Sequence, residues 1–367
     1  MIINLKSPHE LSGFYIVFRG STNLETTGIF GINHFLEHLI CKNLKKLQSK
    51  FFSQGISWNA YTSLNEVVFY FRGLDSNLSK FKDEIIDIIF DLNINEQDLK
   101  KEKGIILEEF PLFFSRPSNN HFYNFTSQHL GSHGPMGTEK DVKNVTLLSI
   151  LDFYQKHFLE PNLIINVSRD FIFKRDDLSF STDHVEKKWT FKKQNSPDIH
   201  SNTPKDQSSI ILYSELLHEQ DFAWINFINS LLSASHSSLL FDKLRNEKGL
   251  VYNIEANQTL FNQQSLITIS TMVSKKNDKK TIDLILETLE NINSLIKLKH
   301  IRNLTNHFIF ESKIKKIDRY KNINRWIFPE NWDVETILKD IDISVLRDKI
   351  NTYYNPKNFE VSIQSSK

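Results

Sequence analysis

The sequence predicts an α+β protein made of two homologous halves, each an α/β sandwich in which helices pack on a mainly antiparallel sheet. Short apolar runs typical of strands alternate with amphipathic helical patterns. A polar, Pro-containing stretch at residues 187–208 interrupts this order. The halves also end alike, since residues 150–168 and 345–363 both contain a helical pattern, a pair of adjacent aromatic residues, Pro, Asn and a strand. This weak repeat indicates two copies of one unit.

The first half opens with an expected strand at residues 13–20 and a helix through GIFGINHFLEHLICKN, for which Thr26 or Thr27 is the expected N-cap. A short helix at KKLQSKFFSQG and two aromatic strands, SWNAYTS and EVVFYFRG, follow. Two further helices are expected at residues 79–92 and 96–112. After a loop containing GSHGPMGT, the helix TLLSILDFYQKHF and the strand NLIINVS complete the half.

The second half repeats this order after the polar stretch. We expect a strand at SIILYSE, a long helix at about residues 220–247, strands around YNIEANQTL and SLITISTMV, and a helix at KKTIDLILETLENINSLI. The predicted domains are therefore residues 1–186 and 209–367, joined by a linker at residues 187–208.

Composition excludes several classes of protein. The 45 basic and 44 acidic side chains nearly cancel, which argues against a nucleic-acid-binding protein. Cys41 is the only cysteine, so no intrachain disulfide forms. The chain shows neither a secretory signal nor an apolar run long enough to span a membrane, which predicts a soluble, cytoplasmic protein without a membrane partner.

The stretch HFLEH carries the strongest chemical signal. His34 and His38 are four residues apart, so on a helix they share one face and can bind one metal ion. Glu37 borders that face and is free to take a proton from a water molecule that the metal activates. A catalytic zinc needs a third protein ligand, and a carboxylate from elsewhere would suit. Alone, this short pattern is equally compatible with packing or surface histidines.

A second acidic helix makes the metal interpretation stronger. LKKEKGIILEEFPLF contains Glu102, Glu108 and Glu109, and Glu102 and Glu109 are two helical turns apart on one side. The two motifs together resemble the pitrilysin, insulinase and mitochondrial-processing-peptidase family of inverted zinc metallopeptidases. The resemblance implies that Glu109 is the third zinc ligand and Glu102 a supporting acidic residue. Glu108 remains the alternative ligand because it is adjacent, and the seven-residue spacing favours Glu109.

Two other stretches strengthen this resemblance. GISWNAYTSLNEVVFYF is similar to the family's edge strand that pairs with extended peptides, and Asn59, Ala60 and Tyr61 are the matching positions. FDKLRNEKGLVYNI is similar to an Arg–Tyr pair, here Arg245 and Tyr252, which would stabilise an oxyanion or hold the substrate backbone. Taken singly, Tyr61 is more typical of a core strand, Arg245 of a surface salt bridge and Tyr252 of a strand aromatic.

The resemblance covers the chain from about residue 13 to its end and implies a zinc-dependent endopeptidase. The substrates would be small or unfolded peptides, including precursor or leader peptides, cleaved in a chamber formed by a homodimer or by a heterodimer with a related subunit. Arg245 and Tyr252 would then serve the partner's zinc site, although action within one chain stays open. The competing interpretation is a non-catalytic partner subunit of a peptidase complex.

The sequence also departs from the family. The spacing between His38 and Glu109 is short, and so is the segment before the first strand, which suggests that an N-terminal strand is missing. Cys41 fits a small buried thiol, and His121, His129 and His133 fit polar loop residues because they lack ligand spacing.

Overall fold

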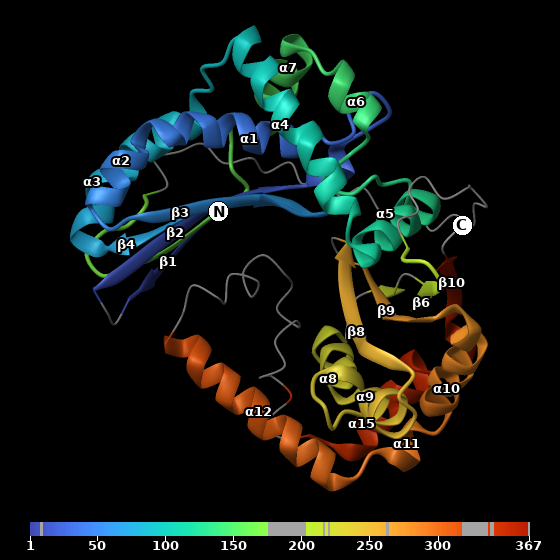
Figure 1. Cartoon of the computed structure of the whole chain (residues 1–367). Helices are drawn as coiled ribbons and strands as arrows, with labels where there is room; N and C mark the ends of the chain where they lie inside the picture. Colours follow the sequence, from blue (N-terminus) through green and yellow to red (C-terminus); the bar gives the residue numbers. More distant parts are fainter. Residues whose placement is uncertain are drawn as a thin grey trace. The chain divides into compact units, whose positions relative to one another are not determined.

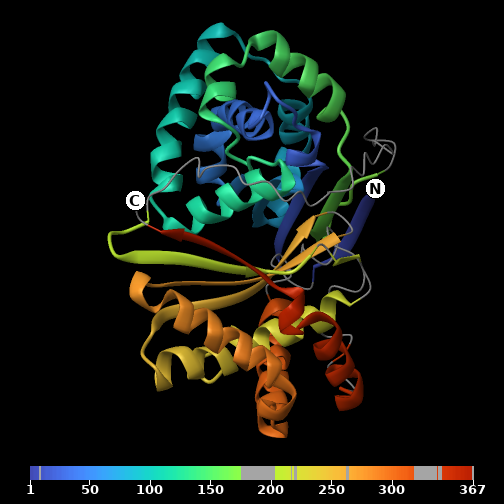
Figure 2. The same cartoon turned by 90° about the vertical axis from the view of Figure 1, so that its right-hand side faces the viewer.

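The computed structural model describes residues 1–7, 10–174, 203–215, 217–218, 221–261, 264–317, 337 and 341–365. The chain divides into two compact units. The first unit comprises Met1–Phe113 and Gly131–Lys187, and the second comprises Phe114–Leu130 and Lys188–Lys367. Both contain one five-stranded sheet and several helices, which confirms the predicted α+β class (Figures 1 and 2).

The first unit contains a sheet of strand order β1-β5-β2-β4-β3. Only the pairing of β1 with β5 is parallel. The strands are β1 (Ile2–Lys6), β2 (Leu11–Arg19), β3 (Ser57–Thr62), β4 (Glu66–Leu74) and β5 (Leu163–Ser168). The presence of β1 corrects the expectation that an N-terminal strand is missing, because five residues suffice to pair with β5 in register from Ile2 to Lys6.

Helices cover one face of this sheet, as Figure 1 shows for α1 and α3. Phe14, Phe69 and Phe71 project from β2 and β4 into the buried layer beneath them. The helices of the first unit are α1 (Ile32–Leu44), α2 (Gln48–Ser53), α3 (Asp75–Phe90), α4 (Glu96–Phe114, whose last residue belongs to the second unit), α6 (Glu139–Asn144) and α7 (Leu147–His157), with short 3-10 turns η1 (Ser21–Leu24) and η2 (Lys45–Leu47).

The second unit contains a sheet of order β10-β6-β9, with β8 on the far side of β9 and β7 pairing with one end of β9. Ile210 and Leu212 of β6 point into the core formed with the helices on one face. The strands are β6 (Gln207–Tyr213), β7 (Leu217–His218), β8 (Val251–Phe261), β9 (Gln264–Ser274) and β10 (Glu360–Ser365). The helices are α8 (Phe222–Ser233), α9 (Leu239–Phe241), α10 (Asp278–Glu290), α11 (Ile292–Leu295), α12 (Leu298–Ile317) and α15 (Ile343–Tyr353), with a π-helical turn η4 (Asp242–Glu247) and 3-10 turns η5 (Lys275–Asn277) and η8 (Pro356–Asn358).

The helix α5 (Pro117–Leu130) corrects the sequence analysis twice, because this segment was expected to be a loop of the first domain. The structure places it in the second unit, on the face of β6 opposite the main core. His121 is buried there, with Nδ1 2.9 Å from Ser209 Oγ and Nε2 2.9 Å from Ser362 Oγ. A polar helix of modest propensity is stable here because the sheet supplies its hydrogen-bond partners.

The expected long helix at residues 220–247 is also wrong, since it is broken after α8. Ser238 Oγ accepts a hydrogen bond from the backbone N–H of Ser235 at 2.8 Å. Serine side chains that bond to nearby backbone compete with helical hydrogen bonds, and the serine-rich stretch 233–238 ends the helix for this reason. The predicted linker at residues 187–208 falls largely outside the described residues.

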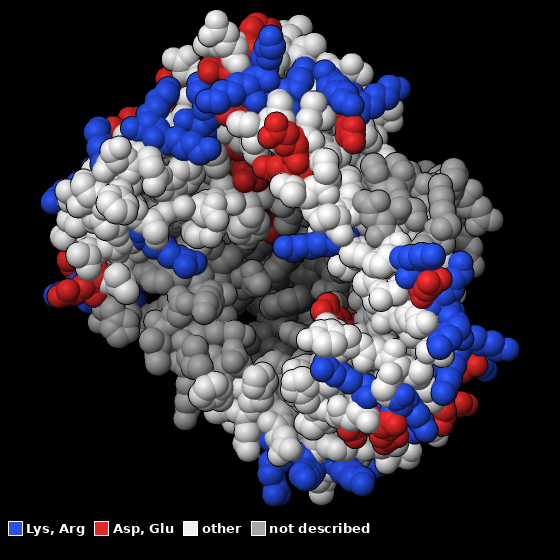
Figure 3. All heavy atoms as spheres, in the orientation of Figure 1, with Lys and Arg blue, Asp and Glu red and all other residues white. Residues whose placement is uncertain are grey.

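The surface carries charges of both signs. On the face shown in Figure 3, basic and acidic side chains both occur, as the balanced composition leads one to expect. Within the described residues, no helix combines the length and the apolar character needed to cross a membrane.

Candidate metal centre

The helix α1 begins at a point set by glycine and by a buried acid. Gly31 has a φ of 89°, and a Cβ at this position would lie 2.7 Å from Met136 O, so the turn requires glycine. Neither Thr26 nor Thr27 caps the helix, contrary to expectation. Instead the carboxylate of Glu25 accepts hydrogen bonds from the N–H groups of Gly31 and Asn33 at 2.8 and 3.1 Å, which satisfies two donors of the first turn.

His34 and His38 project from α1 toward the same carboxylate. His34 Nε2 lies 3.6 Å from Glu109 Oε2, and His38 Nε2 lies 3.5 Å from Glu109 Oε1. One ligand atom from each of the three residues lies within 4.8 Å of the others, and no other such cluster occurs in the part of the chain that the structure describes.

The helix α4 supplies the acidic side of this cluster. Glu109 and Glu102 both face α1, and Glu102 is buried with Oε2 3.4 Å from His38 Nδ1. Glu108 is exposed and lies outside the cluster. The arrangement follows from the helical period, because residues seven apart return to one side while a neighbour points about 100° away.

The three side chains fit a zinc ion. Ligand atoms at 2.0–2.1 Å from a tetrahedral zinc lie about 3.3 Å apart, close to the separations of Glu109 from both imidazoles. Both histidines present Nε2, and an acid beside His38 Nδ1 is the usual support for a zinc-binding imidazole. His34 Nδ1 is buried and has no hydrogen-bond partner among the described residues.

The pKa shifts of His34 and Glu109 favour metal binding, whereas the raised pKa of His38 favours a protonated ring that a metal ion must deprotonate. Burial, reinforced by the neighbouring His38, lowers the pKa of His34 to about 4, so its imidazole is neutral at neutral pH. Burial also lowers the pKa of His38, but its hydrogen bond to Glu109 and the charges of Glu109 and Glu37 outweigh this and raise it overall. The hydrogen bond with His38 lowers the pKa of Glu109, which is therefore an anion.

Glu37 lies on the same side of α1 and is bound to strand β3. Its Oε2 accepts a hydrogen bond of 2.6 Å from Thr62 Oγ1. Burial raises the pKa of Glu37, whereas the Thr62 hydrogen bond opposes that shift. A carboxylate with a raised pKa is a better proton acceptor, which is the property that a general base needs. No role was predicted for Thr62, although it follows Tyr61 in the stretch GISWNAYTSLNEVVFYF.

Strand β3 lies at the edge of the sheet. The backbone N–H of Ser63 donates a hydrogen bond to Glu66 O on the neighbouring strand. In an antiparallel pair, every second residue directs its N–H and C=O groups toward the partner strand, so those of Tyr61 and Asn59 also point toward β4. The main chain of Trp58, Ala60 and Thr62 therefore faces the open edge. Ala60 N accordingly donates to Asn59 Oδ1 at 2.9 Å rather than to β4. Of the three predicted substrate residues, only Ala60 offers its main chain to a peptide, while Asn59 and Tyr61 offer side chains.

Arg245 and Tyr252 lie together in the second unit. The guanidinium carbon of Arg245 is 4.5 Å from the centre of the Tyr252 ring, and Arg245 Nη1 donates to Tyr252 O at 2.5 Å. Arg245 sits in the π-helical turn Asp242–Glu247, a geometry found often at functional sites. The Tyr252 side chain is 81% exposed, so it is available to a ligand.

Other candidate residues do not form a site. Burial raises the pKa of the Cys41 thiol far above its ordinary value, which makes it unreactive. His121 and His129 lie on α5 rather than in a loop, and His133 packs its ring on Phe30.

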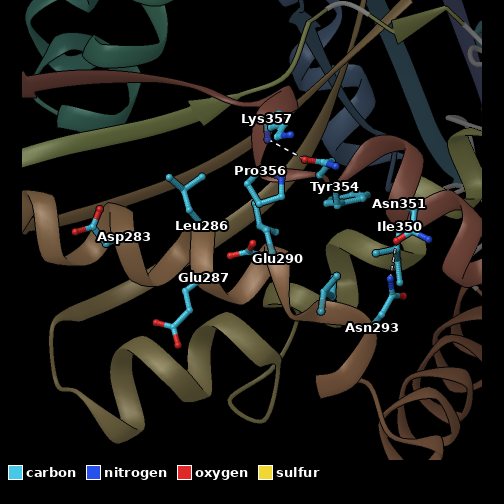
Figure 4. Close-up of a pocket in the computed structure, with 13 residues that line it drawn as sticks. Asp283, Leu286, Glu287, Glu290, Asn293, Ile350, Asn351, Tyr354, Pro356 and Lys357 are labelled. Atoms are coloured by element: carbon cyan, nitrogen blue, oxygen red, sulfur yellow. Dashed lines mark hydrogen bonds between the residues drawn. The ribbon is translucent and has the colours of Figure 1, made fainter.

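A hollow of about 490 Å³ in the second unit also lacks metal-site chemistry (Figure 4). It lies between α10 and the end of α15 and carries Asp283, Glu287 and Glu290. No histidine or cysteine lines it, and these acids do not converge as a metal cluster among the described residues.

Comparison with known proteins gives matches in both units. Residues 6–133 match the family model described as "Insulinase (Peptidase family M16)", and residues 176–302 match "Peptidase M16 inactive domain". An uncharacterized zinc protease of Bacillus subtilis, YmxG, is 26% identical over 289 residues, which cover 73% of this chain and 70% of that protein.

One further relative and one solved structure also match. The beta subunit of the human mitochondrial-processing peptidase is 25% identical over 145 residues, which cover 37% of this chain and 29% of that subunit. A protease from Helicobacter pylori of known crystal structure has a TM-score of 0.79 at 16% identity, covering 99% of this chain and 96% of the other. At this identity the structural match establishes the fold alone.

Proposed function

Because this chain belongs to the insulinase family of peptidases, family M16, we propose that it is a zinc-dependent endopeptidase. The observation that carries the proposal is the convergence of His34, His38 and Glu109, with Glu37 beside them. The names of the relatives, which include zinc proteases, support the choice of metal.

In this proposal each side chain has a definite task. His34, His38 and Glu109 hold the zinc ion, and Glu102 orients His38 through its Nδ1. When bound, zinc supplies a Lewis acid that lowers the pKa of a water molecule and polarises the scissile carbonyl. Glu37 accepts the proton of the attacking water and transfers it to the amine of the leaving peptide.

The substrate binds as an extended strand. An unpaired strand edge accepts a peptide through main-chain hydrogen bonds, and β3 offers the N–H and C=O groups of Ala60 for this. Asn59 Oδ1 must release Ala60 N when a peptide pairs there. Recognition through the main chain requires an extended substrate, so small or unfolded peptides, including precursor or leader peptides, fit this edge.

The direct test separates metal binding from catalysis. The purified parent should contain about one zinc per chain and cleave a quenched peptide library. Glu37→Gln should retain zinc and lose cleavage, while Glu108→Gln, the matched control on α4, should retain both. Cleavage by Glu37→Gln at the parental rate would reject Glu37 as the base, and zinc retained by Glu109→Gln would reject the proposed ligand set.

We further propose that the enzyme works as a dimer, in which Arg245 and Tyr252 of one chain serve the zinc site of another. The name of one relative, a peptidase subunit, agrees with assembly from related subunits, so the partner is a second copy or a related chain. In such a site the guanidinium and phenol stabilise the carbonyl oxygen as it gains negative charge.

A mixing experiment distinguishes action between chains from action within one chain. Glu37→Gln, which should be inactive, and Tyr252→Phe, which should be about tenfold to a hundredfold less active, are mixed and allowed to exchange subunits. If the sites are shared, every mixed dimer regains one intact site, and activity returns to about a quarter of the parental value. No recovery, despite exchange demonstrated with differently tagged chains, would place both groups within one chain.

The alternative function is that of a non-catalytic partner subunit. It is favoured by the description "inactive domain" for the model that matches residues 176–302. That segment contains none of the three residues of the metal cluster, which all belong to the segment 6–133 that matches the peptidase model. A parent that binds zinc but cleaves peptides only when a related subunit is added would favour this alternative.

A further inference from the structure

We propose that Thr62 is a positioning residue that orients the base Glu37 and couples it to the strand on which the substrate binds. The inference rests on the proposed function and assigns a task to a side chain outside the predicted set of site residues. Thr62 contacts the base directly through its hydroxyl group, while its main chain lies at the edge of β3.

The hydrogen bond from Thr62 restricts the carboxylate of Glu37. Its length of 2.6 Å is that of a charge-assisted O–H···O⁻ bond. The terminal torsion of a glutamate is soft, so an untethered carboxylate rotates freely. With Oε2 held by Thr62, Oε1 is left as the proton acceptor. No second hydrogen bond to this carboxylate is found among the described residues of the chain.

The position of Thr62 in β3 gives it a second connection. Its side chain points to the α1 face together with Ala60, while its main-chain N–H and C=O face the open edge. A peptide paired along this edge therefore bonds to the same residue that holds the base. Strand pairing fixes the backbone of Thr62, and the branched Cβ of threonine limits its χ1 rotamers, so a bound substrate also fixes the base.

This arrangement predicts a specific kinetic effect. Removal of the hydroxyl in Thr62→Val keeps the shape and β propensity of the side chain but releases Glu37. Main-chain pairing is retained, so KM stays within about twofold, whereas kcat falls by about tenfold to a hundredfold. Thr62→Ser restores the hydroxyl and recovers most of kcat.

The experiment compares the full-length, zinc-loaded parent with Thr62→Val, Thr62→Ser and a control, Ser57→Val, on a cleavable peptide. Ser57 lies on the same strand with its side chain on the opposite face. All four proteins should contain equal zinc, and only Thr62→Val should lose kcat. A kcat for Thr62→Val equal to that of the parent, or a loss that Thr62→Ser does not recover, would overturn the inference.

A structural readout keeps the inference testable without turnover. Crystal structures of the zinc-loaded parent and Thr62→Val should show one carboxylate orientation for Glu37 in the parent and a rotated or split one in the variant. The same single orientation in both would overturn the inference. A parent that binds zinc but cleaves no peptide would instead count against the proposed function, so the two failures are distinguishable.

Discussion

The two sheets share the order of four of their strands, yet only the first unit carries a metal cluster among the described residues. In the first unit the order β5-β2-β4-β3 runs from the closing strand to the edge, and in the second it is β10-β6-β9-β8. Each unit places a helix between its first strand and its hairpin, α1 in one and α8 in the other. The repeat inferred from the two similar endings is therefore a repeat of topology.

The difference lies in what these two helices bury. The helix α1 carries His34, Glu37 and His38 on the side that faces α4 and β3. The helix α8 is almost entirely apolar on its buried side, where Asn229 is the buried polar residue and accepts a hydrogen bond from Tyr354. The same arrangement of strands and helix thus holds a polar cluster in the first unit and an apolar core in the second. The fold fixes where the helix lies, but it does not fix which side chains the helix carries.

The largest effect should come from removing a metal ligand on α1. His38→Ala should reduce zinc from about one per chain to nearly none and lower activity by about a thousandfold or more, because two protein ligands rarely hold a catalytic zinc. The matched change on α8, Asn229→Ala, should lower stability and leave zinc content unchanged. Metal analysis and peptide cleavage measure both, and equal zinc loss in the two variants would remove the contrast between the helices.

The start of each helix gives a second comparison. Glu25 caps α1, whereas Asp221 at the start of α8 accepts hydrogen bonds from Lys349 and Tyr353 instead. Burial raises the pKa of Glu25 to about 7, although the N–H donors of Gly31 and Asn33 oppose this shift. The folded state therefore keeps a proton that the unfolded state loses near pH 4.5.

Because the pKa of Glu25 is higher in the folded state, protonation of Glu25 stabilises the fold at low pH. The contribution of this proton to the free energy of unfolding is at its full value below about pH 4.5. It declines by up to roughly 3 kcal/mol as the pH rises to about 7. Glu25→Gln should lack this decline. Urea unfolding of both proteins with a chelator, at several pH values, measures the difference, and a difference that does not vary with pH would mean that the donors keep Glu25 ionised.

A smaller effect is expected from Tyr252, the exposed residue that the second unit would contribute to the proposed zinc site. Tyr252→Phe should lower kcat/KM by about tenfold to a hundredfold, because a phenol donor to a developing oxyanion is lost. Zinc content and the unfolding midpoint should not change, since the side chain is largely exposed. Unchanged cleavage kinetics would leave the second unit without a catalytic group at this position.

The smallest effect should come from Phe158 and Tyr354, the aromatic residues directly after α7 and α15. Phe158 stacks on Phe18 with ring centres 4.6 Å apart, whereas Tyr354 donates to Ile225 O and Asn229 Oδ1. Tyr354→Phe should cost about 1 kcal/mol, and Phe158→Tyr about 1–3 kcal/mol, because it buries a hydroxyl in apolar surroundings. Urea unfolding measures both changes. A stabilising effect of Phe158→Tyr would show that position 158 accommodates a phenol hydroxyl as position 354 does.

The sequence predicted elements best where the pattern is local and strongly periodic. The helices α1, α3 and α4 and the strands of both hairpins lie close to the predicted ranges. It failed for α5, which is rich in Asn, Ser and His, although Pro117 at its start and Gly131 after its end were usable signals. It also failed for the break at residues 233–238, where serine side chains bond to the backbone.

By itself the sequence determined the pairing of His34 with His38 and the seven-residue spacing of Glu102 and Glu109, because the helical period fixes which residues share a side. Tertiary structure decided that Glu109, rather than Glu108, faces the imidazoles, that Glu25 rather than a threonine caps α1, and that Thr62 holds Glu37. It also decided that α5 belongs to the second unit. These contacts join segments that sequence periodicity does not relate, so they depend on how helices and strands pack.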